Sequence, residues 1–499
     1  MTFDGTQRRG EALSVVARWC SKRFELQLRL IQLLTIEKSP DQVALSTSLT
    51  NVCTRELELL VEAVVGWGRD SVKVNGSATA RLQIIFPSSD DLLCICHTLN
   101  NAGDHALFAV KREFMTAWLI LVQNDTLAGK LWKQKTRTTL ASFSNTRWWS
   151  RQEVENNITL HFGLLPEFLE ELESRGIGDA TTKKMLSIYR RDPLQLEVSF
   201  AAGYGGLMRM LQTTYNLEGD RLEILLAFRQ VESLRAYGSQ LAFDNENRGL
   251  LPNTDAVIRR ALEPAVGLVI KKEFPGHGIF TGKIHSIDTE DSAKWWYLIE
   301  YEDGDTETMD LQELRPHLSV HGSALRKFAI DGLMGAFKYL EDRLTGKCDS
   351  SYDCTHTYAV FKSAQLFDPS FVAENSGSID ASFVQQLACI VPLARANDGS
   401  LVSDLEGELP DYLSAAAGFT CDHTDVAAFT EAVLGWWRNH GTTIPKWSAA
   451  ARIVFALSPN SCPCERVFSL LESMFGSGQD RALADYLQAA LMLRYNKRL

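Results

Sequence analysis

Two kinds of hydrophobic periodicity follow one another in the first hundred residues, and their order limits the fold more than any other feature. Residues 11–36 alternate apolar and polar side chains in two segments, which is typical of half-buried β-strands. Residues 41–63 and 71–85 space their apolar side chains three and four positions apart, as amphipathic helices do. Short apolar runs before Arg69 and over 92–97 predict two more strands, the latter ending in a polar loop. With a short strand at the N-terminus, the predicted order is strand, strand, strand, helix, strand, helix, strand.

Acidic residues lie at three separated positions of this pattern. Asp4 stands in the first expected strand, Asp70 follows the fourth, and Glu465 lies much later in Cys-Pro-Cys-Glu-Arg-Val-Phe-Ser. Each has an ordinary structural explanation: a turn aspartate before glycine, a helix cap, and an acid in the first turn of a helix that Pro463 begins. Taken together, three carboxylates suit a pair of Mg²⁺ or Mn²⁺ ions that cut phosphodiesters. We therefore predict that the three acids converge.

The surroundings of these acids resemble the three acidic motifs of hAT-superfamily DNA transposases, in the same order. The most specific likeness is C-terminal, where the segments beginning at Trp436, Pro445, Ser461 and Asp480 resemble the dimerisation region of that family. Cys464 stands where the family usually has serine, so a small side chain is retained. The resemblance covers nearly the whole chain apart from one internal segment.

This resemblance implies an α/β fold: a ribonuclease H-like mixed sheet with a large, mainly α-helical insertion. It implies a transposase that cleaves DNA strands, forms hairpins on flanking DNA and transfers strands. Asp4, Asp70 and Glu465 would be its catalytic residues and the ligands of Mg²⁺ or Mn²⁺. The predicted order of strands and helices agrees with that fold, in which the first acid lies on the first strand and the second at the end of the fourth.

Four further residues are implied to contact DNA. His97, in Cys-Ile-Cys-His, resembles the histidine of a family motif near the active site, and would contact a phosphate or base. Arg147, Trp148 and Trp149 lie in Thr-Arg-Trp-Trp, which resembles the family's Thr-Arg-Trp motif. There, an aromatic ring holds a flipped base by stacking. The alternatives are a structural histidine and tryptophans of the hydrophobic core.

Residues 268–318 break the helical pattern that surrounds them. They alternate in a strand-like way around an Asp-Gly turn and resemble a small Tudor- or chromo-type β-barrel inside the insertion. Phe280, Tyr297 and Tyr301 would form a cage that binds methylated lysine or arginine, such as those of histone tails, through cation–π attraction. The default alternative is that these rings pack in the barrel core.

The expected domains follow from these observations. Residues 367–382 and 395–411 are polar and turn-rich and are predicted to be loops. The domains are 1–145, the first part of the ribonuclease H-like core; 146–267, a helical insertion; 268–318, the small barrel; 319–423, the second part of the insertion; and 424–499, the C-terminal region that completes the core.

Composition limits the partners. The net charge of −11 argues against a protein that coats nucleic acid, although 111–151 carries eight Lys or Arg against two acids and is either a local DNA path or a solvated helix face. No apolar run reaches the roughly 20 residues of a membrane span. The ten cysteines show neither a dense disulfide pattern nor four-ligand zinc spacing, so free thiols are expected.

Two functions remain open at this point. One is an active, nuclear, homo-oligomeric transposase that binds DNA, which the three acids favour. The other is a catalytically inactive, domesticated nuclear protein that dimerises and binds DNA or chromatin. The negative charge favours the second, as does the lack in this sequence of the N-terminal zinc finger that family members usually carry.

Overall fold

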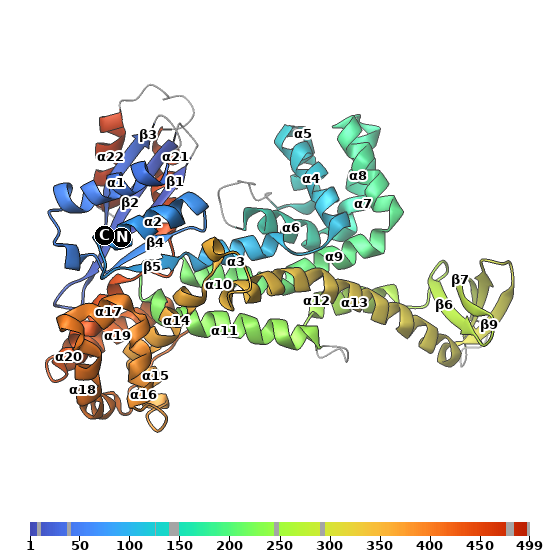
Figure 1. Cartoon of the computed structure of the whole chain (residues 1–499). Helices are drawn as coiled ribbons and strands as arrows, with labels where there is room; N and C mark the ends of the chain where they lie inside the picture. The colour runs from blue at the N-terminus through green and yellow to red at the C-terminus, as the bar shows by residue number, and fades with distance from the viewer. Residues whose placement is uncertain are drawn as a thin grey trace. The chain divides into compact units, whose positions relative to one another are not determined.

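The computed structural model describes residues 1–6, 11–36, 41–124, 126–138, 149–243, 249–289, 295–475 and 484–496. The chain forms two compact units, each assembled from separated segments (Figure 1). The first unit comprises Met1–Asn101, Gln212–Arg235 and Leu340–Leu499. The second comprises Ala102–Leu211 and Ala236–Tyr339. The boundaries predicted from the sequence stay predictions.

A five-stranded mixed sheet lies at the centre of the first unit. In space the strands run β3-β2-β1-β4-β5; β2 is antiparallel to β1 and β3, whereas β4 is parallel to β1 and β5. The sequence correctly predicts the order of elements. They are β1 (Thr2–Thr6), β2 (Glu11–Cys20), β3 (Leu26–Ile36), α1 (Gln42–Asn51), β4 (Gly66–Arg69), α2 (Lys73–Ile85) and β5 (Asp90–Leu93).

The two faces of this sheet are covered by helices from opposite ends of the sequence. Phe3 and Val15 pack with apolar residues of α1 and α2 on one face. Val16 and Leu30 pack on the other face with α21 (Cys462–Phe475) and α22 (Ala484–Asn496). The C-terminal helices are therefore part of the first unit's core, as predicted.

Seven more helices of the first unit lie between residues 355 and 456. Their core is aromatic: Tyr412, Trp437 and Trp447 are fully buried, and each donates a hydrogen bond to a backbone carbonyl. The helices are α14 (Thr355–Ala364), α15 (Pro369–Glu374), α16 (Ala381–Gln385), α17 (Val391–Arg395), α18 (Leu401–Ala416), α19 (Val426–His440) and α20 (Pro445–Ala456).

The loop predicted over 395–411 is wrong for most of its length, because α18 begins at Leu401. Leu401, Leu405 and Leu409 are buried at helical spacing, so burying this stripe outweighs the polar composition. Pro410, which suggested a turn, lies inside the helix. Likewise, α15 and α16 occupy part of the loop predicted over 367–382.

The second unit is mostly helical, as predicted. Trp118, Trp132 and Phe168 form the centre of its core, with the two tryptophan rings 4.9 Å apart. Its helices, several of which share residues with the first unit, are α3 (Ile95–Asp104), α4 (Ala109–Asn124), α5 (Thr126–Thr136), α6 (Ser150–Leu160), α7 (Leu165–Ser174), α8 (Asp179–Arg191), α9 (Pro193–Gly206), α10 (Met208–Leu217), α11 (Glu223–Ala242), α12 (Pro252–Ala261) and α13 (Leu311–Leu344).

The predicted β-unit is a curled four-stranded antiparallel sheet within the second unit (yellow-green in Figure 1). Helix α13 begins at Leu311, and Leu314 and Leu318 on its first turns pack against the sheet. No helix among the described residues is long and apolar enough to cross a bilayer. The strands are β6 (Val269–Phe274), β7 (Gly278–Asp288), β8 (Trp296–Tyr301) and β9 (Thr306–Asp310).

Candidate functional site

Asp4 lies in the middle of the central strand β1 and is buried. Its Oδ1 accepts a 2.8 Å hydrogen bond from the backbone N–H of Gly5. Burial raises the pKa of Asp4 well above its ordinary value, and the carboxylates of Glu465 and Asp70 raise it further, against the opposing effect of His97. The sheet thus holds an acid where its negative charge is poorly compensated by the protein itself.

Asp70 follows β4, which is parallel to β1. Thr2 is paired with Gly68 in register, and the same register continued by two residues sets Asp4 beside Asp70. Gly68 allows the strands to approach, because a Cβ there would come within 2.7 Å of the Thr2 side chain. Asp70 Oδ1 accepts hydrogen bonds from Asn75 Nδ2 at 2.6 Å and from the backbone N–H of Val72 at 3.0 Å. Asp70 is therefore not the cap of α2, whose N-cap is Val72, and its charge contributes to the raised pKa of Asp4.

Glu465 reaches the site from the first turn of α21, as its position two residues after Pro463 predicts. His97 lies opposite, with Nε2 3.7 Å from Glu465 Oε1 and Nδ1 3.3 Å from Ser461 Oγ. Burial lowers the pKa of His97, but Cys94, Glu465 and Asp4 outweigh this effect and raise it well above its usual value.

The expected position of His97 at a strand end is wrong. Strand β5 ends at Leu93, and His97 lies in the first turns of α3. The apolar run that suggested a longer strand is the junction between the two elements. Cys94 fixes this junction, since its Sγ accepts a 3.2 Å hydrogen bond from the backbone N–H of Ser461.

Asp4, His97 and Glu465 together could hold a metal ion. Each offers one ligand atom, and these atoms lie within 4.8 Å of one another. Two carboxylates and an imidazole suit Mn²⁺, and the carboxylates also suit Mg²⁺. Burial and the nearby carboxylates raise the pKa of Asp4, and a bound divalent cation would compensate its negative charge. His97 would have to lose its proton to act as a ligand. Asp70 contributes to the raised pKa of Asp4, but it is not among the residues whose ligand atoms lie within this distance of one another, so the described structure gathers two of the three predicted acids.

Two of the residues predicted to contact DNA, Arg147 and Trp148, lie outside the described residues. Trp149 precedes α6 with a positive φ of 56° and is only 5% exposed. Its ring packs against Gly103, where a Cβ would come within 2.6 Å of it. In this arrangement Trp149 is a core residue, and stacking on a base would require it to leave its site.

Three of the eight cations of the basic segment 111–151 are paired with acids within the second unit. Lys111 Nζ lies 2.6 Å from Glu155 Oε2, and both side chains are buried. Arg151 also pairs with Glu155, and Lys135 pairs with two glutamates of α7. The charge count of the segment therefore overstates what it offers to DNA, and Lys130 and Lys133 remain exposed.

The three aromatic residues predicted to form a cage lie in the β6–β9 sheet. Tyr297 and Tyr301 are 2% and 5% exposed and belong to its core. Phe280 and Tyr301 both contact Phe274 edge-on, at 5.6 and 5.3 Å between ring centroids. These burial values agree with the packing role, and the methyl-ligand cage stays a prediction.

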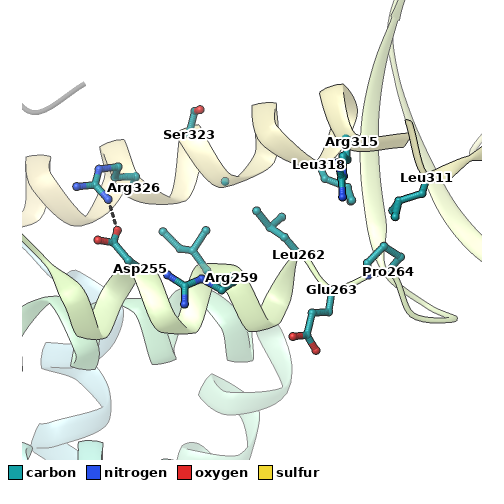
Figure 2. A pocket seen from close by; sticks show the side chains of 12 residues that line it. Asp255, Arg259, Leu262, Glu263, Pro264, Leu311, Arg315, Leu318, Ser323 and Arg326 are labelled. Carbon is teal, nitrogen blue, oxygen red and sulfur yellow. Dashed lines mark hydrogen bonds and ion pairs between the residues drawn. The ribbon is translucent and has the colours of Figure 1, made fainter. Parts of the chain in front are cut away.

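A cavity of about 530 Å³ lies elsewhere in the second unit, between α12 and the first half of α13 (Figure 2). Leu262 and Leu318 give it apolar walls, while Arg259, Arg315 and Glu263 supply charges. Figure 2 shows Leu262 pointing toward α13, whereas Glu263 points away from it. This cavity is not predictable from the sequence, because its lining residues come from two separate helices and form no motif.

Comparison with protein families identifies two segments. Residues 419–496 match the hAT family C-terminal dimerisation region. Residues 267–318 match the PTM/DIR17-like Tudor domain. No curated protein matches the chain. The C-terminal region and the small β-unit are thus similar to the families that the sequence analysis expected.

Proposed function

We propose that this chain is related to hAT DNA transposases and that its first unit is a ribonuclease H-like core for metal-dependent cleavage and transfer of DNA strands. The observation that carries the proposal is the meeting of Asp4 and Glu465, from opposite ends of the sequence, with His97 between them. The strand order β3-β2-β1-β4-β5 and the match over 419–496 support it.

Each acid has a role that its position supports. Two Mg²⁺ or Mn²⁺ ions, when bound, would activate the attacking oxygen and stabilise the leaving oxygen. Asp4, rigid in the central strand, would fix the ligand set, and Glu465 would close it from α21. Asp70 is held in place by Asn75, so its carboxylate has little freedom to swing away. His97 would donate to a DNA phosphate from the same side as Glu465.

Homo-oligomerisation through the C-terminal region is part of the proposal. Helix α22 exposes Tyr486 and Leu493, 63% and 62% of their surface, on positions two helical turns apart. Leu493→Glu should weaken a dimer, because it would bury a charge at the contact. Size-exclusion chromatography with light scattering would show this; an unchanged mass would remove α22 from the interface.

The test of the enzyme is cleavage of DNA in Mn²⁺ or Mg²⁺. Asp70→Asn keeps the shape but removes the charge, and should lower the rate by roughly 100-fold or more, since metal-ion catalysis contributes several kcal/mol. Asp411→Asn, an exposed acid on α18, is the matched control and should cleave normally. DNA binding should depend on phosphate contacts and weaken steeply with salt.

The second candidate is a non-catalytic nuclear protein that dimerises and binds DNA or chromatin. It is favoured by the net charge of −11 and by the internal pairing of Lys111, Lys135 and Arg151. The match over 267–318 supports a histone-tail partner for this function. Wild-type and Asp70→Asn proteins that bind DNA equally and cleave it equally poorly would decide for this second candidate.

A further inference from the structure

A second group of metal-binding side chains lies in the first unit, apart from the acids. Asp368 directly precedes α15, while Cys421 and His423 lie in the irregular segment 417–425 between α18 and α19. One ligand atom of each residue lies within 4.8 Å of those of the other two. More than fifty residues separate Asp368 from the other two, so only the fold brings them together.

The hydroxyl of Ser370 lies between these three side chains. Ser370 Oγ is 2.7 Å from Asp368 Oδ1, 3.1 Å from His423 Nε2 and 3.2 Å from Cys421 Sγ. Asp368 Oδ2 is itself 3.1 Å from the same His423 nitrogen. A Ser-His-Asp hydrolase needs the acid and the serine on different ring nitrogens, so this is not a catalytic triad of that kind.

The donor set is instead that of a transition metal. One sulfur, one imidazole nitrogen and one carboxylate oxygen are the three ligand types that Zn²⁺ takes in proteins, whereas Mg²⁺ and Ca²⁺ prefer oxygen alone. A tetrahedral site needs a fourth ligand, and the Ser370 hydroxyl or a water molecule would supply it. The Asp368 side chain is 5% exposed and that of His423 is 16% exposed, so the group is largely enclosed yet open to an entering ion.

We propose that Asp368, Cys421 and His423 form a structural zinc site. Zinc there would tie segment 417–425 to the start of α15. That segment leads into α19, whose N-terminus is capped by Asp425. The first residues of the stretch that matches the dimerisation region, 419–496, would then be anchored by the metal.

Metal analysis of the full chain, purified without chelators, tests the site. We expect about one zinc per chain. The double variant Asp4→Asn/Glu465→Gln removes the acid cluster and should keep this zinc. Cys421→Ser should lose it. Cys389→Ser is the matched control, because Cys389 is also half-buried against a serine hydroxyl but lies outside the group.

A second measurement keeps the proposal falsifiable if Cys421→Ser does not fold. Cobalt(II) added to the zinc-free wild-type chain should give the intense thiolate-to-cobalt absorption band of a site with a sulfur ligand, and zinc should abolish it. Chelation should also lower the melting temperature. A wild-type chain without bound zinc and without a cobalt–thiolate band would overturn the proposal, as would full zinc content in Cys421→Ser.

Discussion

The acid cluster of the first unit and the β6–β9 sheet of the second differ in how completely their polar groups are compensated. Asp4 is buried near two other carboxylates; burial raises its pKa, and their negative charges raise it further. In the sheet, the hydroxyl of Tyr301 and the ammonium of Lys272 both bond to Glu307, at 2.8 Å and 2.5 Å. A cluster that is left uncompensated costs stability and indicates a site for a ligand, whereas a satisfied one indicates structure.

The largest effect should come from the sheet. Tyr297→Ala removes a ring that is 2% exposed and should lower the free energy of unfolding by about 3–5 kcal/mol. Phe280→Ala, a half-buried ring, should cost clearly less. Denaturant unfolding followed by tryptophan fluorescence would measure both. If Tyr297→Ala abolished the binding of a methyl-lysine peptide without loss of stability, Tyr297 would belong to a methyl-ligand cage and the predicted packing role would be wrong.

The next effect concerns the acid cluster and has the opposite sign. Asp4→Asn keeps an oxygen for the Gly5 N–H but removes a poorly compensated charge, so in the absence of divalent ions it should raise stability at pH 7 by about 1–2 kcal/mol. Added Mn²⁺ should raise the melting temperature of the wild type more than that of the variant. Asp411→Asn serves as control. A destabilised Asp4→Asn would show that the cluster is compensated after all.

A smaller loss of stability should follow removal of one hydroxyl from the hydrogen-bonded group of Tyr301, Lys272 and Glu307. Tyr301→Phe deletes the bond to Glu307 Oε2 and should cost about 0.5–1.5 kcal/mol. The Lys272–Glu307 pair would remain, which limits the damage. Thermal unfolding of the variant measures this loss. An effect as large as that of Tyr297→Ala would mean that the network, rather than the apolar core, holds the sheet together.

The smallest expected effect on stability concerns the pair formed by Asp90, a buried acid of the first unit, and His356. His356 Nε2 lies 2.9 Å from Asp90 Oδ1, and this hydrogen bond raises the pKa of His356 against the effect of its burial. The resulting stability is therefore fully present below about pH 6.5, the ordinary histidine value, and is lost as pH rises through the raised pKa. Because His356 is partly exposed, we expect less than about 1 kcal/mol.

Melting temperatures across this pH range would test that expectation. His356→Gln should flatten the fall in stability above about pH 6.5, whereas His277→Gln, an exposed histidine of the β-unit, should leave it unchanged. Identical pH profiles for wild type and His356→Gln would mean that the pair contributes nothing.

The sequence predicted the sheet well because its signal is local. Much of strands 11–20 and 26–36 alternates apolar and polar residues, and both predicted helices beside them form, although α1 ends at Asn51 and not at residue 63. The predictions of secondary structure were wrong where the residue composition of a segment suggests one structure and its packing in the fold imposes another. The residues around His97 are as apolar as a strand but begin a helix, and the polar residues of α18 hide a buried leucine stripe.

The sites show the same limit. Asp4, Asp70 and Glu465 were predicted because each has a distinctive context in the sequence, but the approach of Asp4 and Glu465 depends on the position of α21 against the sheet. Asp368, Cys421 and His423 were missed, because they follow no fixed spacing and meet only when α15 and the segment before α19 pack together. The burial of Trp149 agrees with the core alternative, but the sequence could not decide for it because the ring packs against Gly103, far away in the chain.

The position of β1 in the middle of its sheet has a consequence for the synthesis of the chain. A ribosome makes β1 first, but α21, which carries Glu465 and covers the strand, emerges almost last. Helices α4–α9 of the second unit are contiguous in sequence and can fold while translation continues. The acid cluster must wait, so a chain still on the ribosome, or one ended early by a stop codon, does not bring Asp4 and Glu465 together.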